Sequence, residues 1–156
     1  MEKLCELVRA GLDFDNIVKK MAEYRKRTHL LFSLESLHNF AANGRVSKIA
    51  AAAAEVLGIR VLGTGSREGK LELLTKSRGR ERSRRDILAE VEKRGYAGGK
   101  MLIAHCQNLK GAEALKNAVI EKFGGTDIRI YPLRGLCSYY AETGGILTAF
   151  EGVPLS

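Results

Sequence analysis

Few side chains in this sequence are of the types that carry out acid–base, nucleophilic or metal chemistry. The histidines and cysteines are His29, His38, His105, Cys5, Cys106 and Cys137. No two histidines have the HxxxH or HExxH spacing that places metal ligands on one helix face, and no CxxC pair occurs. His105 and Cys106 are adjacent on a predicted strand, so their side chains should point to opposite faces and not share a proton. The sequence therefore predicts no metal site, no cofactor and no catalytic residue.

The stretch GTGSREGK at 63–70 has the composition of a phosphate-binding loop, but its spacing does not fit one. A Walker loop needs a glycine where this chain has Thr64, and a Ser or Thr where it has Leu71. The stretch also leads into a predicted strand, whereas phosphate loops lead into the N-terminus of a helix. It is therefore predicted to be the turn of a β-hairpin.

Positive charge is concentrated in one short segment. The 156-residue chain has a formal net charge of +8, and the basic run 76–85, KSRGRERSRR, holds six basic residues and one acid. Such a run suits a phosphate-rich or acidic partner, or it solvates a loop and the start of a helix. None of the aromatic residues lies within it, so it lacks base-stacking platforms, although phosphate contacts alone could bind nucleic acid. A nucleic-acid or other polyanion-binding domain remains the alternative function.

The sequence also indicates where the protein acts. Its longest apolar run is far below the roughly 20 residues that span a bilayer, and no charged-then-apolar leader opens the chain. The odd number of widely spaced cysteines indicates reduced thiols. We expect a cytoplasmic protein with no membrane span.

Hydrophobic periodicity predicts helices alternating with strands in one domain, 1–156. The predicted helices cover 15–27 (capped by Asp15), 35–40, 45–57, 81–94, 108–123 and 135–142. The predicted strands cover 28–34, 59–65, 70–76, 101–106, 127–133 and 144–150. The second and third strands form the hairpin, and the continuous apolar run at 101–106 is expected to be a central strand covered on both faces. The fold class is therefore α/β with α+β features, a mixed or partly antiparallel sheet covered by helices.

The helix predicted over 45–57 is unusual because its core-facing stripe is built from small residues. Val46, Ile49, Ala50, Ala53 and Val56 fall on this stripe. Alanines in place of leucines forgo buried methylenes worth about 0.8 kcal/mol each. Since protein cores leave little empty volume, either a neighbouring element approaches closely or something other than the chain fills the space.

Four segments together resemble the DegV family of bacterial fatty-acid-binding proteins, which includes the acyl-carrying subunits of fatty acid kinase. They are LESLHNFAANGRVSKIAAAAAEVLGIRVL, GKLELLTKSRGRERSRRDIL, KMLIAHCQNLKGAEALK and ETGGILTAFEG. The resemblance covers nearly the whole chain but only the second half of a family member, whose N-terminal Rossmann-like domain has no counterpart here. It implies a six-stranded mixed, largely antiparallel sheet and a lipid-binding module without catalysis of its own.

The resemblance also implies positions for a bound long-chain fatty acid. The family's GRxS turn matches Gly44, Arg45 and Ser47, which places Arg45 near the carboxylate, where its guanidinium could neutralise the charge. The alternative is an arginine that ties down a turn. On the helix that follows, the expected wall of the acyl-chain tunnel is Ile49, Ala50 and Ala53. Full binding would also need hydroxyl groups from the N-terminal domain.

A departure from the family pattern occurs near the C-terminus. Most members carry an HTGPG segment close to the ligand head, and aligning its glycines places Ala141 where the histidine should be. Gly144 and Gly145 are kept, but Ala141 cannot bind a carboxylate and Glu142 would repel one unless it is protonated or turned away. The resemblance leaves Tyr139 and Tyr140 as possible donors.

The kinase resemblance offers a further interpretation of the basic run. Family members dock onto a kinase subunit that phosphorylates the bound acyl group, and an exposed basic surface is a reasonable contact for it. The residues assigned to this docking surface are Arg78, Arg80, Arg82, Arg84 and Arg85.

Overall fold

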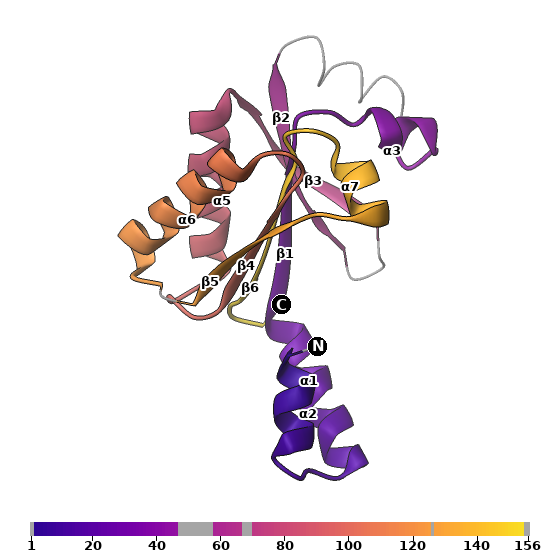
Figure 1. Ribbon diagram of the computed structural model, residues 1–156, viewed down its shortest axis with the longest axis vertical. Helices are drawn as coiled ribbons and strands as arrows, with labels where there is room; N and C mark the ends of the chain where they lie inside the picture. Colours follow the sequence, from indigo (N-terminus) through magenta and orange to yellow (C-terminus); the bar gives the residue numbers. More distant parts are fainter. Residues whose placement is uncertain (1, 47–57, 67–69, 126, 155–156) are drawn as a thin grey trace.

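The structure, a computed structural model, describes residues 2–46, 58–66, 70–125 and 127–154. Its centre is a six-stranded sheet with the order β3-β2-β1-β6-β4-β5 (Figure 1). The strands are β1 (Thr28–Leu34), β2 (Ile59–Gly65), β3 (Leu71–Arg78), β4 (Met101–His105), β5 (Ile128–Pro132) and β6 (Ile146–Glu151). Neighbouring strands are antiparallel except β4 and β5, which run parallel. The predicted mixed, largely antiparallel sheet is confirmed.

Two long helices cover one face of the sheet. They are α5 (Arg80–Lys93) and α6 (Leu109–Phe123), which lie side by side in Figure 1. Asn108 caps α6, because its side chain accepts a hydrogen bond from the Gly111 amide, and Gly124 ends the helix in the left-handed region. The α5/α6-face core consists of Leu31, Leu62, Ile87, Val91, Tyr96, Met101, Ile103, Ala112, Leu115, Val119, Ile128, Ile146 and Phe150.

The opposite face carries two short helices, α3 (His38–Ala42) and α7 (Gly135–Ala141). Beneath them lies the smaller α3/α7-face cluster, whose buried members are Phe32, Leu34, Leu37, Val61 and Ala141. Its partly buried members are Phe40, Ala41, Val46, Cys106, Leu133 and Leu147. The helix predicted over 45–57 falls almost entirely outside the described residues.

The strand β4 shows how unequal the two faces are. Met101 and Ile103 are fully buried on the α5/α6 side, whereas Leu102 and Ala104 are only half-buried. The prediction of a central strand covered on both faces is therefore wrong in part: β4 lies next to the edge strand β5, and one of its faces is incompletely covered. The apolar run alone could not reveal this, because partly covered strands can also be apolar throughout.

The β2–β3 hairpin is confirmed in its described part. The two strands pair from Ile59 with Arg78 to Gly65 with Leu71, with a bulge between Leu62 and Gly63. The Ser66 amide donates a 2.7 Å hydrogen bond to the Lys70 carbonyl, which closes the ladder below the turn. The described residues that follow this segment form the strand β3, whereas a phosphate loop leads into the N-terminus of a helix.

Two N-terminal helices extend beyond the end of the sheet (Figure 1). They are α1 (Glu2–Arg9), which the sequence analysis missed, and α2 (Phe14–Arg27). The cap of α2 is Asp13 and not Asp15, since the Asp13 carboxylate accepts a 2.9 Å hydrogen bond from the Asn16 amide. That hydrogen bond lowers the pKa of Asp13. Asp15 instead lies in the first turn, where a carboxylate also interacts favourably with the helix dipole.

Candidate functional site

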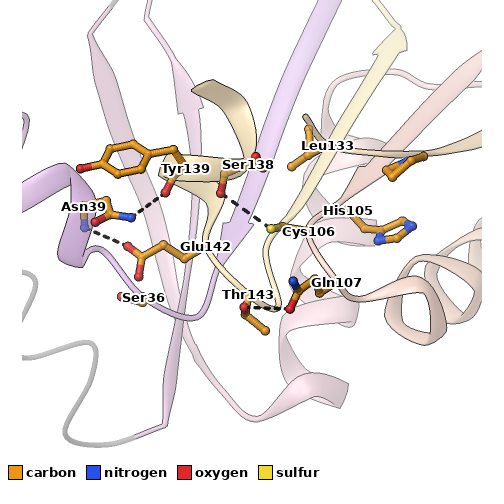
Figure 2. A pocket seen from close by; sticks show the side chains of 11 residues that line it. Ser36, Asn39, His105, Cys106, Gln107, Leu133, Ser138, Tyr139, Glu142 and Thr143 are labelled. Atoms are coloured by element: carbon orange, nitrogen blue, oxygen red, sulfur yellow. Dashed lines mark hydrogen bonds between the residues drawn. The ribbon is translucent and has the colours of Figure 1, made fainter. Parts of the chain in front are cut away.

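An open cleft of about 930 Å³ lies at the carboxyl ends of the parallel strands β4 and β5, beside α7. Open α/β sheets commonly bind ligands at this end of their strands. The lining residues are Ser36, Asn39, His105, Cys106, Gln107, Pro132, Leu133, Ser138, Tyr139, Glu142 and Thr143 (Figure 2). Most of these side chains are polar, and only Glu142 is formally charged at neutral pH.

His105 and Cys106 both contribute to the cleft. Their side chains point away from each other, as predicted (Figure 2): Cys106 packs toward the α3/α7-face cluster, whereas His105 lies toward the start of α6. The Cys106 thiol donates to the Ser138 carbonyl at 3.7 Å, and His105 Nδ1 accepts from the Asn108 amide at 3.2 Å. Each group therefore has its own partner, and the pair is not arranged as a nucleophile with its base.

Glu142 holds α3 against α7. One of its carboxylate oxygens accepts a 2.9 Å hydrogen bond from the Asn39 amide in the first turn of α3, and the Asn39 side chain donates to the Tyr139 carbonyl at 2.7 Å (Figure 2). The N-cap residue of α3, Leu37, has no side chain that can accept a hydrogen bond from this helix. Glu142 thus satisfies a free amide at a helix N-terminus from across the cleft.

The two candidate tyrosines lie in different surroundings. Tyr139 lines the cleft, and its hydroxyl accepts a 3.0 Å hydrogen bond from the Asn43 side chain. Tyr140 stacks on Phe40 with ring centroids 4.6 Å apart and is not among the lining residues. Of the two, only Tyr139 is placed to meet a ligand in the cleft.

Gly144 and Gly145 are buried next to the cleft, and both need to be glycine. Gly144 has a φ of +93°, and a Cβ there would collide with the Glu35 carboxylate, which is paired with Arg60. A Cβ on Gly145 would collide with the Ala141 carbonyl. Packing accounts for both glycines without any contact to a ligand.

The predicted GRxS turn is described only in its first half. Gly44 has a φ of +67°, and its amide donates to the Ala41 carbonyl at 3.0 Å, so it ends α3 as a left-handed C-terminal residue. Arg45 is exposed, does not line the cleft, and makes no side-chain hydrogen bond or ion pair within the described residues. Within the described residues, the structure thus shows no hydrogen bond by which the Arg45 guanidinium would stabilise the turn. The predicted site residues Ser47, Ile49, Ala50 and Ala53 lie outside the described residues.

The cleft joins the apolar interior of the α3/α7 face. Cys106 and Leu133 line the cleft and also pack against the α3/α7-face cluster. A ligand with a polar head in the cleft could therefore extend an apolar tail along the cluster. Most of the polar residues that line the cleft were not predicted from the sequence. Ser36 and Gln107 each follow the carboxyl end of a predicted strand, and this position could have marked them as candidate site residues.

The structure separates the basic run into several environments. Arg82 pairs with Asp86 at 3.1 Å, and Arg84 pairs with Glu81. Arg80 and Arg84 line a second cavity on the α5/α6 face, and Arg78 is the last residue of β3. None of these arginines lines the cleft.

Two further features can be stated for the residues the structure describes. They contain no group of three or more His, Cys, Asp or Glu side chains placed to hold a metal ion. In the same part of the chain, no helix combines the length and apolar character needed to cross a membrane.

The chain forms an α/β domain with a cleft at the strand ends, lined mostly by polar residues, that adjoins an apolar sheet face. The chain belongs to the DegV family: the family model, described as that of an uncharacterised protein, matches residues 1–151. A DegV domain-containing protein of Streptococcus pneumoniae is 41% identical over 151 residues, which are 97% of this chain and 54% of the relative. The chain thus spans about half the length of the curated relatives it matches.

Two solved structures are similar over nearly the whole chain. A DegV family protein from Eubacterium eligens, loaded with heptadecanoic acid, has a TM-score of 0.93 and 43% identity over 97% of this chain and 55% of its own. The fatty acid kinase B3 protein of Streptococcus pneumoniae, loaded with linoleic acid, has a TM-score of 0.93 and 41% identity over 97% of this chain and 54% of its own.

Proposed function

We propose that this chain is a lipid-binding module that holds a long-chain fatty acid, with the carboxylate in the cleft and the acyl tail along the α3/α7-face cluster. The observation that carries the proposal is the continuity between the two, through Cys106 and Leu133. An amphipathic ligand needs such a junction, because its tail gains about 25 cal/mol for each Å² of apolar surface removed from water. The two fatty-acid-loaded relatives support the choice of ligand.

Hydroxyl and amide groups of the cleft would bind the head of this ligand. Tyr139 and Thr143 carry hydroxyl groups that line the cleft, and Gln107 adds a side-chain amide. Among the described residues, no arginine or lysine lines the cleft, so Arg45, which follows α3, remains the proposed source of positive charge. Glu142 uses one carboxylate oxygen on the Asn39 amide, which turns part of its charge away from the ligand.

The module is proposed to act without catalysis, as an acyl carrier for a fatty acid kinase. The naming of a similar protein as the fatty acid kinase B3 protein supports this role. The exposed part of the basic run, including Arg78, Arg82 and Arg85, is the proposed contact with the kinase subunit. The module is proposed to act in the cytoplasm, where thiols such as those of its three cysteines stay reduced. The alternative of nucleic-acid binding receives no support from the similar proteins.

The test measures lipid in the protein directly. The protein that carries this chain is purified from bacterial cells and denatured, and the organic extract is analysed by mass spectrometry for fatty acids. We expect long-chain fatty acid at close to one equivalent, and protein that is free of lipid and gains no thermal stability from added fatty acid would refute the proposal.

A matched pair of variants locates the acyl tail. Leu147→Ala removes a partly buried side chain of the α3/α7-face cluster, and Leu88→Ala removes one that packs against the α5/α6-face core. Both should lose comparable stability, but only Leu147→Ala should lower the retained fatty acid. An equal loss of lipid in both variants would contradict the assignment of the tail to the α3/α7 face.

A further inference from the structure

The second cavity lies on the opposite face of the sheet from the cleft, where α5 and α6 both begin. It has a volume of about 150 Å³, and its walls come from both helices and from β1, β2 and β6. Among the described residues, its lining includes four cationic ones, Arg60, Arg80, Arg84 and Lys110, and one acidic one, Glu81. Cationic side chains from one strand and two helices thus converge on a space that a few water molecules would fill.

Two of the four cations are compensated and two are not. Arg60 pairs with Glu35, and Arg84 pairs with Glu81. Arg80 and Lys110 make no ion pair or side-chain hydrogen bond within the described residues. Arg80 and Lys110 are both exposed, so solvent screens their mutual repulsion, but both charges remain available to an anion that enters the cavity.

The walls of the cavity combine apolar side chains, such as Ile87 and Leu115, with polar groups that are held by hydrogen bonds. The buried Ser33 and Ser83 hydroxyls are hydrogen-bonded to each other at 2.8 Å. The Asn108 side chain donates to the Gly144 carbonyl at 2.8 Å while its oxygen caps α6. The Arg60 side chain is only 8% exposed and is held by its carboxylate partner. The cavity would therefore need little rearrangement to accept a ligand.

The start of α5 adds backbone donors to this charge. Its N-cap residue is Gly79, which has no side chain to cap the first turn. The amides of that turn are therefore open to an acceptor, and the positive end of the helix dipole lies on the same side. These amides supplement the convergence of Arg80 and Lys110, which is the main feature of the site.

We propose that this cavity binds a phosphate group, with Arg80 and Lys110 supplying the charge and the first-turn amides of α5 the hydrogen bonds. A tetrahedral phosphate accepts hydrogen bonds from several directions at once, which suits donors that converge from two helices. The site is separate from the acyl cleft and does not depend on the proposed function. The phosphate is either that of a small soluble compound or that of a lipid headgroup.

The first experiment titrates the 156-residue chain with inorganic phosphate and follows backbone amide signals by NMR, with sodium chloride at equal ionic strength as the reference. We expect saturable shifts confined to the first turns of α5 and α6. Shifts that do not saturate, or that chloride reproduces, would overturn the proposal.

Charge variants test the assignment. Arg80→Gln/Lys110→Gln should weaken phosphate binding by about tenfold or more, since two charge-assisted hydrogen bonds are lost. The matched control, Lys93→Gln/Lys122→Gln, removes the same charge from the other ends of α5 and α6 and should leave binding unchanged. Equal weakening in both double variants would show non-specific attraction and overturn the proposal.

A size variant and a lipid assay complete the test. Ala114→Leu narrows the cavity without changing its charge, so it should also abolish phosphate binding, and unchanged binding would refute the site even if the charge variant fails to fold. Sedimentation with phosphatidylcholine vesicles, with and without phosphatidic acid, distinguishes the two sources. Binding that requires phosphatidic acid and Arg80 and Lys110 assigns a lipid headgroup, and binding of inorganic phosphate alone assigns a soluble ligand.

Discussion

Within the described residues, the two faces of the sheet differ in how many buried side chains pack against them. The α5/α6-face core has thirteen buried members beneath two long helices, whereas the α3/α7-face cluster has five, beneath two short ones, within the described residues. The first face is filled by its own side chains except at the small second cavity, and the second face adjoins the open cleft. We therefore expect stability to depend mainly on the first face and fatty-acid binding on the second, and each expectation can be tested separately.

The largest effect is expected from emptying the α5/α6-face core. Ile103 is fully buried there, so Ile103→Ala should lower the free energy of unfolding by about 2–5 kcal/mol. The protein that remains folded should still carry its fatty acid, because the cleft is unchanged. Chemical denaturation measures the free energy of unfolding, and mass spectrometry of the folded fraction measures the bound fatty acid. Loss of fatty acid with unchanged stability would show that Ile103 serves binding and not the stability of the core.

The next largest effect concerns the segment beside the cleft. Gly144→Ala places a methyl group against Glu35 at a φ of +93°, which should cost about 1–3 kcal/mol of stability and displace the Glu35–Arg60 pair. Gly11→Ala is the control, because Gly11 also has a positive φ but a methyl group there would meet no other atom within 4 Å. Equal destabilisation of the two variants in thermal unfolding would show that backbone strain alone is responsible.

A smaller effect is a pH dependence that arises on the α5/α6 side. His29 is buried, donates from Nε2 to the Val153 carbonyl at 2.8 Å, and has no partner for Nδ1 within the described residues. Burial lowers its pKa below the ordinary value of 6.5. As the pH falls below this value, the unfolded chain takes up a proton before the folded one, so the stability due to neutral His29 is lost progressively.

Denaturation curves measured from about pH 7.5 down to about pH 5.5 test this dependence. Stability should decline less steeply in His29→Phe than in the unsubstituted protein, whereas the exposed His38→Phe should decline like the latter. Parallel declines in all three proteins would exclude His29 as the source.

The smallest change in stability is expected in the cleft itself. Glu142→Gln keeps an oxygen for the Asn39 amide but removes the negative charge, so stability should change by less than about 1 kcal/mol. Fatty-acid affinity should rise several-fold, because repulsion between two carboxylates is removed. The control is Glu121→Gln on α6, and an unchanged or lower affinity in Glu142→Gln would show that this carboxylate does not meet the ligand head.

Much of the fold could be predicted from the sequence, because the elements carry clear periodicity and end signals. β1 and β2 have the predicted bounds, and Asn108 and Gly124 delimit α6 as expected. The helix α1 was missed although Leu4, Leu7 and Val8 form an apolar stripe, because its eight residues are fewer than the window over which helical periodicity is usually judged. The choice between Asp13 and Asp15 as a cap depended on the turn before α2, which sequence pattern does not determine.

The candidate site was less predictable than the fold, because its residues meet only through the strand order. Ser36, Gln107 and Thr143 lie far apart in the chain and come from separate loops at the strand ends. The basic run looked like one surface in the sequence, but helix geometry directs Arg80 toward a cavity and pairs Arg82 with Asp86. A count of charges along the sequence shows neither which arginines form ion pairs nor which side of the helix each arginine occupies.

The strand order has a consequence for how the protein folds during synthesis. The last strand, β6, lies between β1 and β4, and it alone joins the β3-β2-β1 half of the sheet to the β4-β5 half. Thr28 of β1 pairs with Glu151 of β6, so the pairing of these two central strands brings together residues separated by most of the chain. Such non-local pairing forms slowly. The two halves must therefore wait for β6 to leave the ribosome, and until then each exposes an unpaired strand edge to chaperones and to other nascent chains.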